Sequence, residues 1–287
     1  MFYGALGYAD DVILLSPTVS GMKYLLQVCA QYGKEYNVLF NPDKTKLIHV
    51  NNLKCTMSNI MFMGKSIARV DYEKHLGFPV GNVKTEQVVT QAINEFIIKV
   101  NMVKSHFKFL PPDIMYKLFK TYCMPLYGCP LWDYSDKIMC KFYVAWRKAI
   151  RSILGLPRRT HCSLLNEICH DMSINDQLYS RFVSFFHSLL FSTNQLTNTC
   201  AKLALRGSNS NVSNNILIAS NRLAISRDNF MYVKLCRKQL FPRSISDTAS
   251  LIIDLLHTRY NYTFLPEGET FLLTRDVQYA IDYLCTT

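Results

Sequence analysis

Two adjacent aspartates interrupt the apolar run that opens this chain. The stretch GALGYADDVILLS, residues 4–16, places Asp10 and Asp11 among leucine, isoleucine and valine. Carboxylates are almost never buried without a partner. Neighbouring side chains of a strand point to opposite faces, so two adjacent aspartates can serve one site only where the chain turns tightly. The run therefore predicts two short strands that meet near Ala9, with both carboxylates at the tip of a β-hairpin.

A hairpin tip with two carboxylates allows two interpretations. Mg²⁺ binds oxygen ligands and is usually held by one or two protein carboxylates together with substrate phosphates. Two such ions can align an attacking hydroxyl and a leaving pyrophosphate for phosphoryl transfer. The alternative is an Asp-Asp turn in solvent, in which the acids only serve turn geometry. The spacing alone leaves both interpretations open.

The pattern before about residue 83 predicts strands and one helix. Apolar residues recur at helical spacing over 21–36, after a Pro-Thr-Val-Ser break with the character of a helix cap. An Asn-Pro-Asp turn then leads into a strand over 45–50. Glycine turns predict one or two hairpins over 57–80. This part of the chain is therefore expected to be rich in β-structure.

The pattern after about residue 83 predicts helices. One helix begins near this point, a second follows the proline pair at 111–112, and a third is stopped by Gly155. Further helical patterns continue to residue 191, and the polar stretch RGSNSNVSNN predicts a linker over 206–215. The predicted fold class is α+β, with β-hairpins and one helix followed by an all-helical region.

The positive charge is concentrated in the first part of the chain. The net charge is +11. Residues 1–160 hold 21 Lys and Arg against 11 Asp and Glu, a net charge of +10, whereas residues 161–287 hold 11 against 10, a net charge of +1. A localised excess of cations indicates a surface for an anionic partner such as a nucleic acid.

A predicted helix near residue 145 carries much of this charge. Seven basic residues and no acid lie from Lys137 to Arg159. On a helical wheel four of them fall within about a third of the circle, opposite apolar side chains. Such a face suits a phosphate backbone, although a solvated face of an amphipathic helix is the alternative. Lysines of the preceding helices could extend this track: Lys99, Lys104, Lys108, Lys117 and Lys120.

Cysteines and apolar runs bear on zinc and on compartment. The ten cysteines contain no C-x-x-C pair, and Cys162, Cys169 and His170 leave a tetrahedral zinc site one ligand short. No structural zinc is therefore expected. The opening run lacks the basic start of a signal peptide, and no apolar run reaches the roughly 18 residues of a membrane span. We expect an intracellular, soluble protein with free thiols.

The order of several short motifs resembles the later palm motifs of reverse transcriptases. YADDVILLS, a helix, LFNPDKTKL and YEKHLGFPVG follow one another as they do in non-LTR, LINE-like retrotransposon enzymes. MPLYGCPLW, WRKAIRSILGLPRRTHCSLL and INDQLYSRFVSFFHSLL are similar to the thumb and post-thumb segments of that family. The resemblance spans about Leu6 to Asn194. It implies an RNA-directed DNA polymerase, a nucleotidyltransferase that acts on an RNA template and a DNA primer or duplex.

The resemblance also implies roles for single residues. Asp10 and Asp11 would be catalytic and would bind Mg²⁺ or Mn²⁺, and Lys44 would donate a proton near the incoming nucleotide, although at least one of Lys44 and Lys46 is expected to be an ordinary turn lysine. Residues near the primer or nucleotide would be Tyr8, Asn41, Lys46, His75, Leu76 and Gly77. His75 stands where the family usually has tyrosine. The nucleic-acid-binding residues would be Lys141, Arg147, Lys148, Arg151, Arg158 and Arg159.

On this resemblance we expect four regions. They are a partial palm at 1–82, thumb-like helices at 83–135, a basic post-thumb helical region at 136–195 and a C-terminal helical region of unknown role at 196–287. The family acts in the nucleus, which implies a nuclear location here.

The resemblance also leaves a gap. The family mechanism needs another carboxylate on an upstream strand and a fingers region, and the nine residues before Asp10 leave no room for either. We therefore expect a C-terminal piece that is inactive alone and whose partner is the missing N-terminal half. A non-catalytic nucleic-acid-binding module and a decayed retroelement product are the alternatives.

Overall fold

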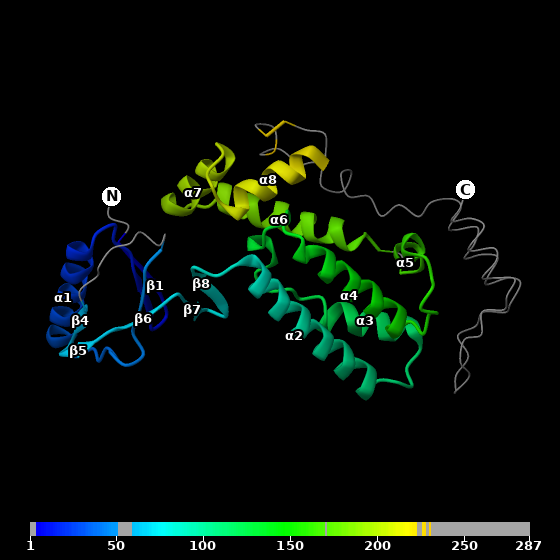
Figure 1. The fold of residues 1–287 in the computed structure, drawn as a ribbon, viewed down its shortest axis with the longest axis horizontal. Helices are drawn as coiled ribbons and strands as arrows, with labels where there is room; N and C mark the ends of the chain where they lie inside the picture. Colours follow the sequence, from blue (N-terminus) through cyan, green and yellow to red (C-terminus); the bar gives the residue numbers. More distant parts are fainter. Residues whose placement is uncertain (1–3, 51–58, 170, 223–225, 228–229, 231–287) are drawn as a thin grey trace, which may run out of the picture. The chain divides into compact units, whose positions relative to one another are not determined.

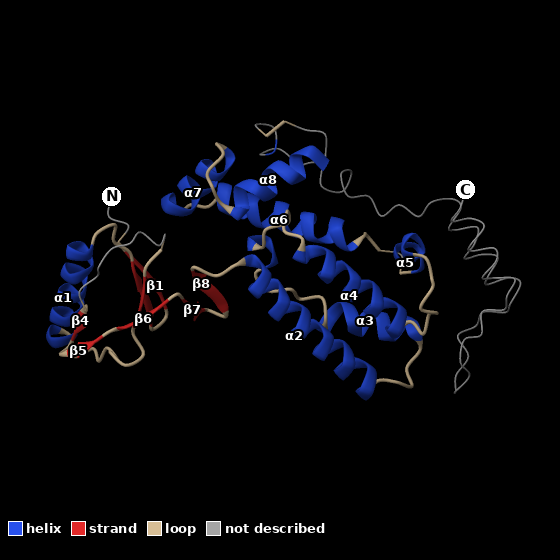
Figure 2. Ribbon diagram, in the orientation of Figure 1, coloured by secondary structure: helices blue, strands red, loops and turns tan. Residues whose placement is uncertain are grey.

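All the described strands lie in the first part of the chain together with one helix, and the other described helices follow them (Figure 1, Figure 2). The computed structural model describes residues 4–50, 59–169, 171–222, 226–227 and 230. The chain divides into two compact units, Met1–Lys84 and Thr85–Thr287. This division lies close to residue 83, where the hydrophobic pattern changes.

The first unit holds the strands and one helix. Its elements are β1 (Ala5–Tyr8), β2 (Asp11–Leu14), α1 (Val19–Glu35), β3 (Lys46–Ile48), β4 (Met61–Phe62), β5 (Lys65–Ser66), β6 (Ala68–Val70), β7 (Tyr72–His75) and β8 (Phe78–Gly81). The helix predicted over 21–36 and the strand predicted over 45–50 are thereby confirmed, with small differences at their ends.

The described part of the second unit is helical. Its elements are α2 (Thr85–His106), α3 (Pro112–Tyr122), the short 3₁₀ helix η1 (Cys129–Leu131), α4 (Ile138–Ile153), α5 (Cys162–Ile168), α6 (Ile174–Leu190), α7 (Gln195–Leu205) and α8 (Asn211–Arg222). Small sheets and eight α-helices in the described residues confirm the general α+β class. None of the helices described here is both long and apolar enough to cross a membrane.

Three tight turns build the antiparallel pairs of the first unit. β1 pairs with β2, β4 with β5, and β7 with β8, each through a two-residue turn. The first turn residues, Ala9, Met63 and Leu76, have φ values of 52°, 50° and 50°. Positive φ at this position matches the turn to the right-handed twist of the strands. β3 and β6 form a parallel pair, which the sequence pattern did not indicate.

The core of the first unit is small. Its buried apolar side chains come from α1, β4 and the residues that flank the β4–β5 hairpin: Leu26, Ile60, Phe62 and Ile67. Leu6, Tyr8 and Val12 on the first hairpin remain exposed. The apolar run that opens the chain therefore forms strands without being fully covered by the described residues.

Aromatic rings from three helices meet in the core of the second unit. Phe142 on α4 packs edge-to-face against Phe96 on α2 and against Trp132, with ring centroids 5.8 and 5.6 Å apart. Phe96 also meets Phe119 on α3 at 5.9 Å. All four side chains are fully buried. Edge-to-face pairs add to the free energy gained by burying apolar area, so these contacts hold α2, α3 and α4 together.

The linker predicted over 206–215 is wrong from residue 211 onward, where α8 begins. Asn215 is fully buried. Its carboxamide oxygen accepts a hydrogen bond from the Tyr134 backbone N–H at 2.9 Å, and its amide donates to the Trp132 carbonyl at 2.7 Å. A buried amide with such partners carries little desolvation cost. The polar residues that suggested a linker therefore satisfy the backbone that follows η1. Of the predicted region 196–287, residues 231–287 lie outside the described residues.

A buried carboxylate joins α3 to the segment before α6. The Asp171 side chain is only 5% exposed, and it pairs with Lys120. The Tyr116 hydroxyl donates to the same carboxylate oxygen at 3.0 Å. Burial, together with Cys169 and Asp171, raises the pKa of Tyr116 well above its usual range. Burial also raises the pKa of the Cys169 thiol to about 12, so this thiol stays protonated near neutral pH.

Replacing Lys120 with methionine should destabilise the second unit. The change leaves Asp171 buried with one partner fewer, so the free energy of unfolding should fall by about 2 kcal/mol, the usual scale for a hydrogen bond to a charged group. Urea denaturation followed by circular dichroism measures this. Lys117→Met on the same helix is the control, because the Lys117–Asp113 pair is exposed and spans 3.9 Å. Equal effects of the two changes would contradict a role for the buried pair.

Candidate functional site

Asp10 and Asp11 lie at the tip of the first hairpin, as predicted. Tyr8 pairs with Asp11 across the strands, and Ala9 and Asp10 form the turn between them. Both aspartates are exposed, and the Asp11 side chain is 58% exposed. The carboxylates therefore keep their hydration, which resolves the conflict between their charge and their apolar neighbours.

The hairpin pairing decides which side chains share a face with Asp11. Directly paired residues of an antiparallel sheet project to the same side, so Asp11 shares its face with Tyr8. The next pair on that face is Leu6 with Ile13. Tyr8 is 64% exposed. The hairpin thus presents a carboxylate beside an accessible aromatic ring.

The predicted motif at His75–Gly77 lies next to the Asp10–Asp11 turn. His75 ends β7, and its Nδ1 atom lies 3.9 Å from Oδ2 of Asp11. Leu76 and Gly77 form the turn into β8, with φ values of 50° and 79°. Two hairpins that are far apart in the sequence therefore meet at Asp11 and His75.

Asn41 shapes the third predicted motif. Its side-chain oxygen accepts hydrogen bonds from the backbone N–H groups of Asp43 and Lys44, at 2.9 and 3.2 Å. The Thr45 hydroxyl donates to the Asn41 carbonyl at 2.9 Å. Lys46 Nζ donates to the Asp43 carbonyl at 3.4 Å. This is an Asx turn, in which the side chain of Asn41 fixes the local backbone.

Lys44 and Lys46 are both exposed on this turn. Within the described residues, no hydrogen bond or ion pair joins either lysine to Asp10 or Asp11. The structure therefore brings His75 to the aspartates but does not bring these two lysines into contact with them.

The donor chemistry at the hairpin tip fits a hard cation, but the ligand set is small. Carboxylate oxygens are the ligand type that suits Mg²⁺ and Mn²⁺. In the part of the chain that the structure describes, no group of three or more His, Cys, Asp or Glu side chains is arranged to hold a metal ion. Asp10 and Asp11 would thus need substrate phosphates and further ligands to complete a metal site.

Helix α4 separates its apolar and basic faces largely as predicted. Phe142, Trp146 and Ile150 are buried, whereas Lys141 and Lys148 are exposed. These two lysines are seven residues apart, which is two helical turns, so they lie on one face. The exposed face of α4 therefore presents cations to solvent.

Arg151 and Arg147 differ from the two lysines. The Arg151 guanidinium donates to the carbonyl of Thr160 from Nε at 3.0 Å and from Nη2 at 2.7 Å. Nη2 also donates to Sγ of Cys162 at 3.3 Å. Arg147 is half-buried. Arg151 thus stabilises the chain that follows α4, and this chain carries the exposed Arg158 and Arg159.

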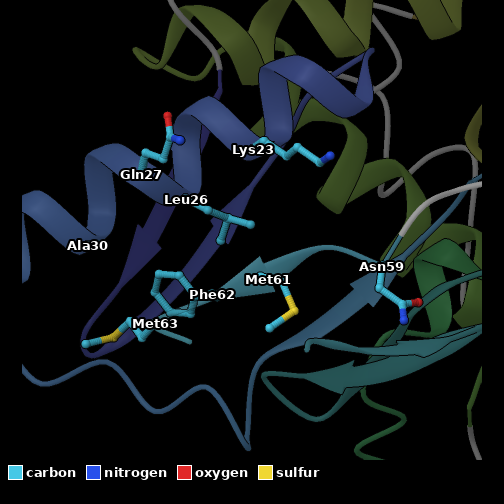
Figure 3. Close-up of a pocket in the computed structure, with 8 residues that line it drawn as sticks. All are labelled: Lys23, Leu26, Gln27, Ala30, Asn59, Met61, Phe62 and Met63. Atoms are coloured by element: carbon cyan, nitrogen blue, oxygen red, sulfur yellow. The ribbon is translucent and has the colours of Figure 1, made fainter. Parts of the chain in front are cut away.

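A hollow of about 300 Å³ lies elsewhere in the first unit, between α1 and the β4–β5 hairpin. Figure 3 shows Leu26 pointing from α1 toward Phe62 on β4, and both side chains line the hollow. Met61 and Met63 also line the hollow. None of the predicted site residues lines it, so the hollow is separate from the Asp10–Asp11 tip.

Comparison of the chain with protein-family models, with curated proteins and with solved structures found no match.

Replacing Arg151 with glutamine should lower stability, whereas replacing Lys148 with glutamine should not. Arg151→Gln leaves the buried Thr160 carbonyl without its guanidinium donors, at a cost of about 1–3 kcal/mol in the free energy of unfolding. Lys148→Gln changes an exposed side chain and should stay within about 0.5 kcal/mol. Chemical denaturation of both variants tests the distinction. A stable Arg151→Gln variant would show that these hydrogen bonds contribute little.

Proposed function

We propose that this chain forms part of an RNA-directed DNA polymerase of the non-LTR retrotransposon type, with Asp10 and Asp11 as metal-binding catalytic residues. The observation that supports this most directly is the meeting of two hairpins, with His75 Nδ1 3.9 Å from the Asp11 carboxylate. Exposed carboxylates at a turn can approach a phosphate-bound cation, and the neighbouring turn can support the primer strand beside them. The order of the motifs along the chain supports the same proposal.

The side chains would divide the work of nucleotidyl transfer. Bound Mg²⁺ would align the primer hydroxyl with the departing pyrophosphate. Asp10 and Asp11 would supply oxygen ligands, and the His75–Gly77 turn would position the primer end. Lys141 and Lys148 would hold the phosphate backbone through contacts that do not depend on sequence.

A second candidate is a nucleic-acid-binding protein without catalytic activity. The small ligand set at Asp10 and Asp11 favours it, because two adjacent carboxylates from one hairpin do not complete a two-metal site. Both candidates use the same basic face of α4. Polymerase activity separates them.

The purified chain should fail to extend a primer on an RNA template in the presence of Mg²⁺ or Mn²⁺. The described residues supply carboxylates from one hairpin only, so the metals would lack a further protein ligand. A primer-extension assay on the wild type and on Asp10→Ala measures this. Robust extension that Asp10→Ala abolishes would contradict the need for another carboxylate and would establish the chain as a complete polymerase.

Binding to a short DNA duplex should weaken as salt rises. For B-DNA the logarithm of the affinity falls by about 0.9 per phosphate contact for each unit of the logarithm of the salt concentration. Lys141→Gln combined with Lys148→Gln should therefore reduce this slope by about 2. Lys202→Gln on α7 removes an exposed cation from another helix and serves as the control. An unchanged slope in the double variant would remove α4 from the binding surface.

A further inference from the structure

The turn between α2 and α3 exposes aromatic side chains. Its sequence is HFKFLPP, residues 106–112. Phe109 is 87% exposed, and Phe107 and Leu110 are each more than a third exposed. Phe109 together with Phe107 and Leu110 therefore forms a small exposed apolar patch, which is the kind of surface that ligand-binding sites use.

Local hydrogen bonds and prolines hold this turn in one shape. The backbone N–H of Phe107 donates to the Val103 carbonyl at 3.0 Å, and that of Leu110 donates to the Phe107 carbonyl at 3.0 Å. Pro111 and Pro112 follow, and their rings fix the φ angle at the start of α3. Two backbone hydrogen bonds and two prolines restrict the turn, which lowers the free-energy cost of ordering it around a ligand that stacks on Phe109.

Two lysines lie in and just before the turn. Lys108 Nζ lies over the Phe109 ring, 4.6 Å from its centroid. Lys104 Nζ donates to the Ser152 hydroxyl at 2.5 Å, which brings the end of α2 against the end of α4. Lys148 lies one turn before Ser152 on α4.

Two further cations, Arg158 and Arg159, come later in the chain. They are exposed and follow the end of α4, where Arg151 binds the next residue, Thr160. The acid closest in sequence to the turn, Asp113, lies 3.9 Å from Lys117, so its charge is partly balanced. The exposed aromatic ring therefore lies under one lysine, in a connection whose residues 104–112 hold two lysines and no acid.

We propose that Phe109 stacks on a nucleic-acid base, so that this end of the helices binds unpaired nucleotides in preference to the interior of a duplex. The proposal rests on the nucleic-acid binding proposed above. Stacking on aromatic rings tolerates any base, while lysine and arginine neutralise the backbone. Lys108 lies over the ring, yet Phe109 is 87% exposed, so the ring keeps accessible surface on which a base can stack. Insertion into a membrane is less favourable, because it would carry the Lys108 ammonium into the lipid with the ring.

The test compares three fluorescent oligonucleotides of equal charge in an anisotropy titration. They are a single strand, the same strand with abasic sites throughout, and a duplex whose ends are closed by covalent loops without bases. The wild type should bind the single strand most tightly. Phe109→Ala should weaken that complex about tenfold, the usual scale for losing one base stack, and should leave the other two unchanged. Phe109→Trp, which keeps an aromatic ring, should bind the single strand as tightly as the wild type does.

The matched control is Phe191→Ala, which removes a phenylalanine that is 67% exposed at the end of α6. It should bind all three oligonucleotides as the wild type does. If Phe109→Ala binds as the wild type does while the α4 lysine variants bind weakly, stacking is wrong and the basic surface stands. If the wild type binds none of the three, the proposed function fails as well. A parallel titration with phosphatidylserine-containing vesicles tests the membrane alternative. If Phe109→Ala weakens binding to these vesicles and to none of the oligonucleotides, the turn binds membranes and the proposal is overturned.

Discussion

Asp10, Asp11, Asp171 and Arg151 each either keep their water or find a partner, and the arrangement of the candidate functional groups follows from that choice. Asp10 and Asp11 keep their water because a two-residue turn places them at a hairpin tip. Asp171 is buried and is matched by Lys120 and a tyrosine hydroxyl. The Arg151 guanidinium donates its hydrogen bonds to a backbone carbonyl. Charges available to a ligand are thus separated from charges that stabilise the fold.

The sequence predicted these features unequally. The position of the aspartates followed from a general rule, since adjacent acids in an apolar run require a turn. The apolar face of α4 followed from helical periodicity. The hydrogen bonds of Arg151 could not be predicted in this way, because their acceptor is the carbonyl of Thr160, which lies beyond the end of the helix. Periodicity reports which face a residue occupies, but it carries no information about backbone groups outside the helix.

Two other features escaped prediction for related reasons. Asn215 belongs to a polar stretch that looked like a linker, yet it binds backbone groups of residues 132 and 134. The meeting of His75 with Asp11 is a long-range contact that the sequence did not predict. The exposed turn at Phe109, in contrast, had a signal in the sequence: two phenylalanines flank a lysine shortly before two prolines. Apolar side chains in so short a connection between helices have few buried positions to occupy, so their exposure could have been predicted.

The turn at Ala9 limits which amino acids can replace this alanine. Its φ of 52° lies in the left-handed region, where the steric clash between side chain and backbone is most severe for β-branched residues. Glycine, asparagine or aspartate would be accepted there, and valine, isoleucine or threonine would be rejected. The residue before the two acids is therefore constrained by the geometry of the peptide chain itself. That constraint holds whatever the two acids do, so variation at position 9 reports on the geometry of the hairpin and carries no information about the acids.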